Sequence, residues 1–287
     1  MPFAIPFPNI DPVIFSVDIF GLTLALRWYA LAYLVGLVGG LYLLRWLARQ
    51  PRLWTDGQAP YDQEAPDRLL TYMVIGVILG GRLGYVLFYN PAHFLANPAE
   101  ILQVWAGGMS FHGGFLGVIV GVILFARVNR LPVLSLADVV AMAAPIGLLL
   151  GRIANFINGE LWGRPSDVSW AVIFPHGGPL PRHPSQLYEA ALEGALLLIV
   201  LWTLAMKAGW LKHPGRISGL FFIGYGMARS FVELFREPDA HFSAPDNPIG
   251  YALQFGAENG LTMGQMLSLP MILIGIGFIW LSTRKSA

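Results

Sequence analysis

The stretch from Gly151 to Gly163, GRIANFINGELWG, most constrains this chain, because it places charged and amide side chains at the end of a strongly apolar run. Besides Arg152 in this stretch, Arg27, Arg82 and Arg229 also lie inside apolar runs. If these runs cross a membrane, each charge costs on the order of 3 kcal/mol or more unless it is paired or lines a wet cavity. Four such arginines predict an anion-binding site.

The composition favours a membrane protein. Hydrophobic residues make up 55% and charged residues 12%, whereas about a quarter of the residues in soluble domains are charged. The mean hydropathy is +0.59. A membrane-spanning helix needs about 20 apolar residues. Such runs lie at about 22–44, 68–89, 111–127, 133–157, 187–207, 217–235 and 265–283. We therefore expect an all-α polytopic membrane protein with about seven transmembrane helices. The third run is short and begins at His112, so it is either a span or a partly re-entrant segment.

The basic residues predict the orientation, because loops rich in Lys and Arg stay in the cytoplasm. Eleven of the 18 lie on one predicted side and three on the other, and four lie within spans. The eleven are Arg45, Arg49, Arg52, Arg68, Arg127, Arg130, Lys207, Lys212, Arg216, Arg284 and Lys285; the three are Arg164, Arg182 and Arg236. We expect the N-terminus outside and the C-terminus inside. Residues 1–18 contain no Lys or Arg, so we expect them to be retained and not to act as a cleaved signal peptide.

Several classes of function are disfavoured by what the chain lacks. It has no cysteine, so a disulfide framework, a protein thiol nucleophile and a thiolate metal site are excluded. The six histidines show no paired-ligand spacing, and we expect no metal and no cofactor. The net charge of +1 offers no broad basic face for nucleic acid.

The predicted orientation places the polar groups at one level. Arg27 and Tyr29 lie near the outer end of the first span, and Arg82, Arg152 and Arg229 lie near the outer ends of theirs. Asn155 follows Arg152 by one helical turn. Lipid phosphates meet the acyl region at this depth. A transporter would more often hold its site at the midplane, between internal repeats.

Two of these arginines have alternative interpretations. Tyr225, Arg229, Glu233 and Arg236 are spaced 4, 4 and 3 residues apart and share one helix face. Arg229 and Glu233 therefore form an intrahelical ion pair, or the arginine fork binds phosphate oxygens. Arg82 either snorkels or pairs structurally, or it binds substrate.

Glycines at fourfold spacing occur in several runs, and their expected role is close helix packing. They are Gly36 and Gly40; Gly76, Gly80 and Gly84; Gly113, Gly117 and Gly121; and Gly147 and Gly151. His112 precedes the third set, which puts a titratable imidazole beside backbone that a ligand can approach. The segment 181–189 reads as a helix start with Ser185 as the N-cap, and we expect a structural role for Glu189.

Together these motifs resemble the prolipoprotein diacylglyceryl transferases of the bacterial inner membrane. The resemblance covers nearly the whole chain. It rests on residues 11–15, 27–29, 80–85, 107–114, 151–163, 182–189, 224–229 and 235–239. With the orientation predicted above, residues 1–287 form one integral membrane domain whose segments 158–185 and 237–264 lie outside, on the side that the polar groups face. In the bacterial inner membrane that the resemblance implies, this side is the periplasm.

The resemblance also implies an activity. The diacylglyceryl group of phosphatidylglycerol would pass to the lipobox cysteine thiol of a preprolipoprotein, with membrane lipids as surroundings. The implied roles are phosphate and headgroup binding for Arg152 and Arg229, positioning for Asn155 and Glu160, and lipid or phosphate contact for Tyr29 and Tyr225; Gly163, Glu233, Arg236 and Arg82 complete the candidate binding set.

The displacement needs a deprotonated thiol and a neutralised leaving phosphate. His112 is the candidate base, because an imidazole with an unperturbed pKa of about 6.5 suits proton removal near neutral pH. An arginine base is chemically harder, since its pKa exceeds about 12. The alternatives are a lipid or anion transporter without covalent chemistry and a phospholipid headgroup transferase. Headgroup transferases commonly use metal-binding Asp clusters, which the spans lack.

Overall fold

The computed structural model describes residues 4–89, 91–238, 243–244, 247–256 and 259–284 of the 287. The chain forms two compact units, residues 41–139 and residues 1–40 with 140–287. Helices α1 (Trp28–Ala48) and α5 (Val133–Ile157) each contribute to both. Parts of the second predicted periplasmic segment, 239–242, 245–246 and 257–258, lie outside the described residues, as do 285–287.

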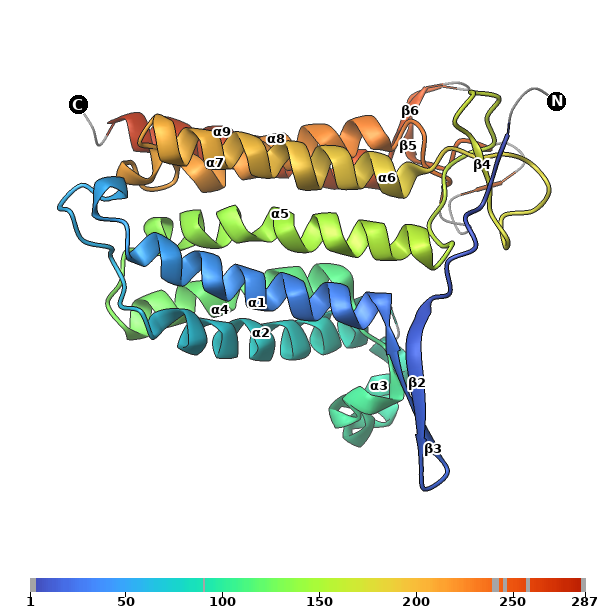
Figure 1. The fold of residues 1–287 in the computed structure, drawn as a ribbon, viewed down its shortest axis with the longest axis horizontal. Helices are drawn as coiled ribbons and strands as arrows, with labels where there is room; N and C mark the ends of the chain where they lie inside the picture. The colour runs from blue at the N-terminus through green and yellow to red at the C-terminus, as the bar shows by residue number, and fades with distance from the viewer. Residues whose placement is uncertain (1–3, 90, 239–242, 245–246, 257–258, 285–287) are drawn as a thin grey trace. The chain divides into compact units, whose positions relative to one another are not determined.

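The larger unit contains all six strands of the described residues and the C-terminal helices (Figure 1). Its strands are β1 (Ile5–Pro6), β2 (Val13–Ile19), β3 (Leu22–Arg27), β4 (Val172–Ile173), β5 (Tyr251–Gln254) and β6 (Gly260–Thr262). Its helices besides α1 and α5 are α6 (Ser185–Glu189), the π-helical η4 (Ala190–Leu196), α7 (Leu197–Lys207), the short η5 (Trp210–Lys212), α8 (Arg216–Val232) and α9 (Met263–Arg284). β1 pairs in parallel with β4, and β2–β3 and β5–β6 are antiparallel hairpins.

The smaller unit is built around α2 (Ala65–Phe88) and α4 (Phe111–Val128). Short helices connect its parts: η1 (Pro51–Leu53), α3 (Pro91–Ala96), η2 (Pro98–Leu102) and η3 (Val104–Ala106). Two side chains fasten the loop after α1 to that helix. Trp54 Nε1 donates to the Leu47 carbonyl at 3.0 Å, and Tyr61 Oη donates to the Leu44 carbonyl at 2.9 Å. Burial raises the pKa of Tyr61 above its usual range, so the phenol stays a donor at neutral pH.

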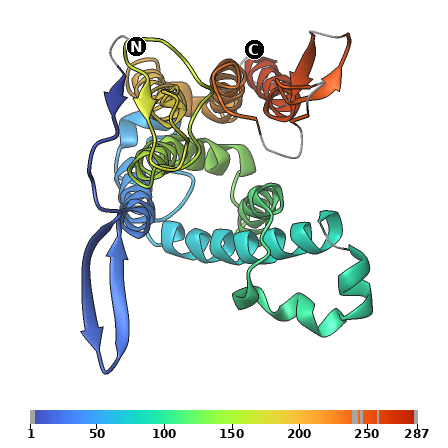
Figure 2. The same ribbon diagram turned by 90° about the vertical axis from the view of Figure 1, so that its right-hand side faces the viewer.

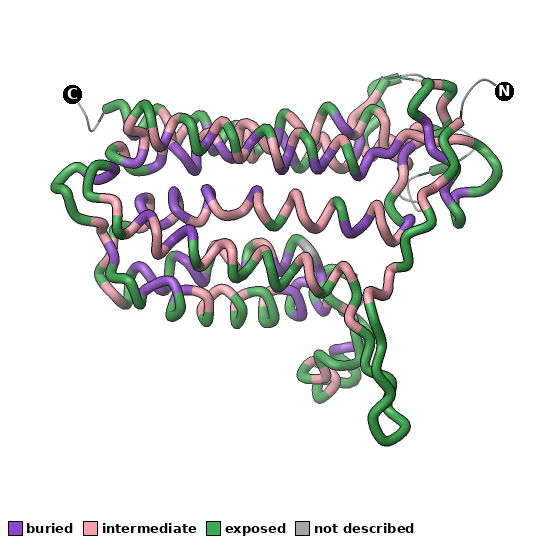
Figure 3. The backbone as a smooth tube through the Cα atoms, in the orientation of Figure 1, coloured by how far each residue is buried: buried purple, intermediate pink, exposed green. Residues whose placement is uncertain are grey.

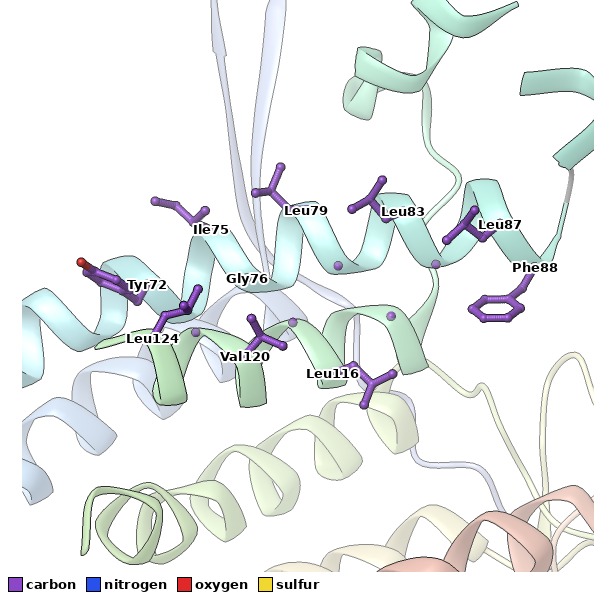
Figure 4. A pocket seen from close by; sticks show the side chains of 15 residues that line it. Tyr72, Ile75, Gly76, Leu79, Leu83, Leu87, Phe88, Leu116, Val120 and Leu124 are labelled. Atoms are coloured by element: carbon purple, nitrogen blue, oxygen red, sulfur yellow. The ribbon is translucent and has the colours of Figure 1, made fainter. Parts of the chain in front are cut away.

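The glycines of α2 and α4 bring these helices into backbone contact, which confirms the packing predicted for them. A Cβ on Gly76 would collide with the Gly117 carbonyl, and one on Gly80 with the Gly113 carbonyl. The close approach leaves an apolar groove of about 580 Å³ along the pair. Ile75, Leu79 and Leu83 are among its lining residues (Figure 4). By contrast, Gly147 and Gly151 of α5 have no atom within 4 Å of an added Cβ.

The predicted helices are present, with one change of boundary. Among the described residues, five helical stretches are long and apolar enough to cross a membrane: Trp28–Ala48, Ala65–Phe88, Val133–Ile157, Ser185–Lys207 and Met263–Arg284. The shorter helices α4 and α8 occupy the other two predicted runs. The count of seven spans and their orientation stay predictions. The apolar helices and the composition nevertheless identify the chain as a helix-rich membrane protein.

The expectation that the first helix starts near residue 22 is wrong, and short strands accompany the helices of this mostly helical chain. Residues 22–27 form β3, which pairs with β2. Phe20 and Gly21 turn the chain with φ values of 49° and 82°, the positive values that a tight hairpin turn requires. The residues before Trp28 are apolar at alternate positions, and this period of two fits a strand.

Candidate functional site

Six charged side chains of the larger unit gather where α5, the α6–η4 helix and α8 come together. They are Arg152 of α5, Glu189 and Glu193 of the α6–η4 helix, Arg229 of α8, and Glu233 and Arg236 just after α8. Three are cationic and three are acidic, so their formal charges balance. We call this group the arginine cluster.

Glu189 lies at the centre of the arginine cluster, and its side chain is only 1% exposed. Its Oε1 lies 2.6 Å from Arg229 Nη1 and 3.4 Å from Arg236 Nη1. Its Oε2 lies 3.0 Å from Arg152 Nε. One carboxylate therefore holds three guanidinium groups that come from different segments of the chain.

The ion pair between Arg229 and Glu233, one of the two alternatives for Arg229, is present. Arg229 Nη2 pairs with Glu233 Oε1 four residues along the chain. The same guanidinium also binds Glu189 through Nη1. Because a guanidinium has five N–H donors, the two ion pairs still leave donor capacity for a phosphate.

Glu193 is the most enclosed member of the arginine cluster, with no exposed side-chain area. Its Oε2 lies 4.0 Å from Arg152 Nη2, and neither of its oxygens accepts a hydrogen bond from any of the described residues. Buried carboxylates normally have hydrogen-bond donors. Glu193 also lies in the π-helical turn of η4, and such turns are frequent at functional sites.

Asn155 and Glu160 form a second polar group, at the C-terminal end of α5. Asn155 Nδ2 donates to Glu160 Oε1 at 2.8 Å, and Asn158 Nδ2 donates to the same oxygen at 3.2 Å. Buried Gln186 donates from Nε2 to the Glu160 carbonyl at 2.6 Å. The structure thus brings the two predicted positioning residues together. Their role toward the arginines stays a prediction.

Gly163 lies where three segments of backbone meet. Its N–H donates to the His183 carbonyl at 2.8 Å, and it forms an antiparallel bridge with Arg236. Arg182 Nη1 donates to the Gly163 carbonyl at 3.2 Å. A Cβ on Gly163 would lie 2.5 Å from the Phe235 carbonyl oxygen and 2.7 Å from the His183 carbonyl oxygen. Only glycine fits without moving this backbone.

We expect Gly163→Ala to destabilise the protein by about 2–3 kcal/mol, the upper part of the range for overpacking, because the added methyl group meets backbone that cannot rotate away. Thermal unfolding in detergent measures the change. The control is Gly277→Ala in α9, where nothing lies within 4 Å of an added Cβ. Equal unfolding temperatures for the two variants would contradict the packing of Gly163.

The helix start predicted within segment 181–189 is confirmed, but its predicted cap is wrong. Ser185 does not cap the helix, because the helix begins at Ser185 itself and its hydroxyl donates to the Leu161 carbonyl at 3.1 Å.

His183 Nδ1 lies 3.0 Å from Tyr188 Oη, which accepts a hydrogen bond from Trp170 Nε1 at 2.6 Å. Burial lowers the pKa of His183, against the opposing effect of the Asp167 carboxylate. His183 is therefore mostly neutral at pH 7.

The two candidate tyrosines lie on different helices of the larger unit. Tyr29 follows the first residue of α1, and its Oη accepts from Tyr33 Oη at 3.4 Å. Tyr225 of α8 stacks on Phe221 with ring centroids 5.9 Å apart. Gly226 beside it packs against α9, since an added Cβ would lie 3.0 Å from the Ser268 carbonyl oxygen. The lipid or phosphate contacts of both tyrosines stay predictions.

Arg82 and His112 belong to the smaller unit. Arg82 is 5% exposed, and its guanidinium donates to the carbonyls of Glu100, Ile101, Gly107 and Gly108 at 2.6–3.2 Å. These four bonds fasten the segment before α4 to α2.

His112 is the second residue of α4, and it is exposed. The helix starts with Ser110 Oγ accepting a hydrogen bond from the Gly113 N–H at 3.2 Å. The substrate-binding role of Arg82 and the base role of His112 stay predictions.

The sequence alone did not identify the importance of Glu189 and Glu193. A signal was present, because the two carboxyl groups are spaced four residues apart and lead into an apolar run. Acidic side chains within a span cost as much as the arginines do and need partners for the same reason. Acidic residues inside a predicted span therefore indicate ion pairs with cationic side chains, although not which arginine each glutamate contacts.

Comparisons with known proteins concern the whole chain. A family model described as prolipoprotein diacylglyceryl transferase matches residues 12–281. The phosphatidylglycerol–prolipoprotein diacylglyceryl transferase of Cereibacter sphaeroides is 56% identical over 99% of each chain. A protein of the same name from Rhodospirillum rubrum is 55% identical over 96% of this chain and 93% of its own length. Another, from Methylocella silvestris, is 52% identical over 100% of this chain and 99% of its own.

Proposed function

Because the chain belongs to the prolipoprotein diacylglyceryl transferase family, we propose that it transfers the diacylglyceryl group of phosphatidylglycerol to the lipobox cysteine of a preprolipoprotein. The bond between the glycerol carbon and the phosphate oxygen breaks, and a bond between that carbon and the cysteine sulfur forms. The products are a thioether-linked lipoprotein precursor and glycerol phosphate. Since this chain has no cysteine, the sulfur comes from the protein substrate.

The observation that carries this proposal is the arginine cluster, in which Glu189 holds Arg152 and Arg229 by one carboxylate. A phosphatidylglycerol phosphate is a monoanionic diester, and negative charge builds on it as the carbon–oxygen bond breaks. Guanidinium groups fit phosphate oxygens in bidentate fashion. We place the phosphate against N–H groups of Arg152 and Arg229 that their ion pairs leave available; the two side chains are 19% and 15% exposed.

Glu189 is a positioning residue in this proposal. It fixes the side chains of Arg152 and Arg229 relative to each other before the lipid arrives, so little reorganisation is needed when charge develops. Each guanidinium of the arginine cluster also lies beside a carboxylate, which avoids the cost of an unpaired charge in an apolar setting. A purified sample that adds a diacylglyceryl group to a lipobox peptide would support the activity.

The thiol needs a base, and His112 is the proposed one. If it takes the thiol proton, His112→Gln should lower the rate by about 10² to 10⁴, the usual contribution of a general base. Raising the pH should restore the rate, because a cysteine thiol ionises near pH 8.5. A pH profile from 6 to 10 with saturating phosphatidylglycerol measures this. Exposed His176 provides the control His176→Gln, and a deficit that stays constant across the profile would refute the base role.

We expect no metal requirement. Among the residues that the structure describes, no group of three or more His, Asp or Glu side chains could hold a metal ion. Charge neutralisation by arginine replaces the Lewis acid that headgroup transferases use. Turnover with excess EDTA should therefore equal turnover without it. A loss that one specific divalent ion restores would refute this expectation.

We also propose the location in the bacterial inner membrane, with the arginine cluster toward the periplasm. This rests on the basic residues, which gather in the loops after α1, α4 and α7, and on the positive-inside rule. In this arrangement the 1–287 chain is one membrane domain, and the segments 158–185 and 237–264 form a small periplasmic head. Accessibility of cysteines introduced into these segments to a membrane-impermeant thiol reagent tests the orientation.

A further inference from the structure

We propose that the β2–β3 hairpin is a lipid-binding ribbon, whose apolar face lies in the membrane surface beside the start of α1. This inference does not depend on the transferase reaction. It concerns a part of the larger unit that the arginine cluster does not use.

The strand register places the large apolar side chains of the hairpin on one face. The directly opposed pairs are Phe15 with Leu26, Val17 with Leu24 and Ile19 with Leu22. Opposed residues of an antiparallel pair share a face, and alternate residues point to opposite faces. All six side chains therefore lie on one face, without a charged residue among them.

The opposite face is small and polar. Ser16 opposes Ala25, and Asp18 opposes Thr23. Thr23 Oγ1 donates to Asp18 Oδ1 at 2.5 Å. The hairpin is therefore amphipathic across its thickness, with one side suited to lipid and the other to water.

Most of the β2–β3 hairpin is coloured as exposed in Figure 3. Phe15, Val17, Ile19, Leu22 and Leu24 are 46–63% exposed, and Phe20 at the turn is fully exposed. A contiguous apolar surface of this kind marks an interaction site. An isolated two-stranded hairpin is also marginally stable in water, so a partner on this face would stabilise it.

The connection to α1 identifies lipid as that partner. β3 ends at Arg27, and α1, which is long and apolar enough to cross a membrane, begins at the next residue. Trp28 ties the two ends of the hairpin together, because its N–H donates to the Pro12 carbonyl at 3.2 Å and its Nε1 donates to the Asp11 carbonyl at 3.1 Å. The base of the hairpin is thus held at the point where the chain enters the membrane.

The direction of the hairpin fits the same partner. β2 and β3 run across the axis of α1 and not along it, in both views (Figures 1 and 2). If α1 crosses the bilayer, the hairpin extends along the membrane surface. An apolar face in this position can enter the boundary between headgroups and acyl chains, as amphipathic interfacial segments do. Phe20 at its tip adds a large apolar side chain of the kind that interfacial segments bury there.

The absence of cysteine in the chain makes a direct test simple. Single spin labels at Val17→Cys and Leu24→Cys report the apolar face, and labels at Ser16→Cys and Ala25→Cys report the matched polar face. The protein is reconstituted in vesicles of phosphatidylglycerol and phosphatidylethanolamine, without peptide substrate. Collision with oxygen, which is enriched in lipid, is compared with collision with a water-soluble nickel chelate.

We expect the labels at 17 and 24 to collide more with oxygen and the labels at 16 and 25 to collide more with nickel. Equal nickel accessibility at all four positions would overturn the proposal. Two other results would also overturn it, by assigning a different occupant. Spin–spin broadening at 17 and 24 would mean a second copy of the chain, and protection that appears only with a lipobox peptide would mean the protein substrate.

A second measurement tests whether the labelled hairpin keeps its strand register. The double variant Ser16→Cys/Ala25→Cys places two thiols at directly opposed positions, whose Cβ atoms lie about 5 Å apart in an antiparallel pair. Efficient disulfide formation in the same vesicles shows that the register is kept. Preserved register together with nickel-accessible labels at 17 and 24 would rule out the lipid contact.

Discussion

Arg152→Lys should lose nearly all transferase activity, although the positive charge is kept. In the structure, Arg152 uses Nε toward Glu189, while Nη2 lies 4.0 Å from Glu193. An ammonium cannot bind a carboxylate and present a planar fork to a phosphate at the same time. We expect the rate to fall by about 10²-fold or more, comparable to removing one donor from an oxyanion site.

The measurement is the initial rate of peptide lipidation at saturating phosphatidylglycerol. The matched control is Arg68→Lys, because Arg68 pairs with Asp62 at 2.7 Å on an exposed surface, with 49% of its side chain accessible. That control should keep its rate, since exposed ion pairs contribute little. Near-normal turnover by Arg152→Lys would remove this arginine from the phosphate site.

Glu189→Gln should damage both stability and activity. The amide keeps the size of the side chain but removes the charge that holds Arg152, Arg229 and Arg236. Breaking a buried ion pair on one side typically costs about 3–5 kcal/mol, because the partner charge stays buried. The three guanidinium groups would also repel one another and lose their common orientation.

Thermal unfolding and lipidation rate, measured on the same samples, test the role of Glu189. The control is Glu237→Gln, because Glu237 pairs with Arg182 at 3.0 Å but is 41% exposed. Its stability should change by less than about 1 kcal/mol. If Glu189→Gln matches the control in both measurements, Glu189 does not organise the arginines.

Local patterns in the sequence predicted much of the fold. Each of the seven apolar runs contains a helix, because periodicity and length are local properties. The fourfold glycines predicted close helix packing, since small residues let backbones approach, and in the structure Gly76 and Gly117 are in backbone contact. The spacing of Arg229 and Glu233 gave their ion pair as one of two alternatives, and the structure contains that pair.

Contacts between distant segments were not predictable in the same way. Glu189 lies 37 residues from Arg152 and 40 from Arg229 along the chain, and nothing local indicates that its carboxylate reaches both. The partners of Arg82 are backbone carbonyls of residues 100–108, which have no side-chain signature. The strand at 22–27 was read as helix, because a short apolar run fits either structure until its pairing partner is known.

One measurement tests the central claim most directly: the mass of a lipobox peptide after incubation with the purified protein and phosphatidylglycerol vesicles. A matched peptide with serine in place of the lipobox cysteine is the control. We predict that the cysteine peptide gains one diacylglyceryl group, that glycerol phosphate is released in equal amount, and that the serine peptide stays unchanged. A folded protein that leaves the cysteine peptide unmodified in the presence of phosphatidylglycerol would contradict the proposed function.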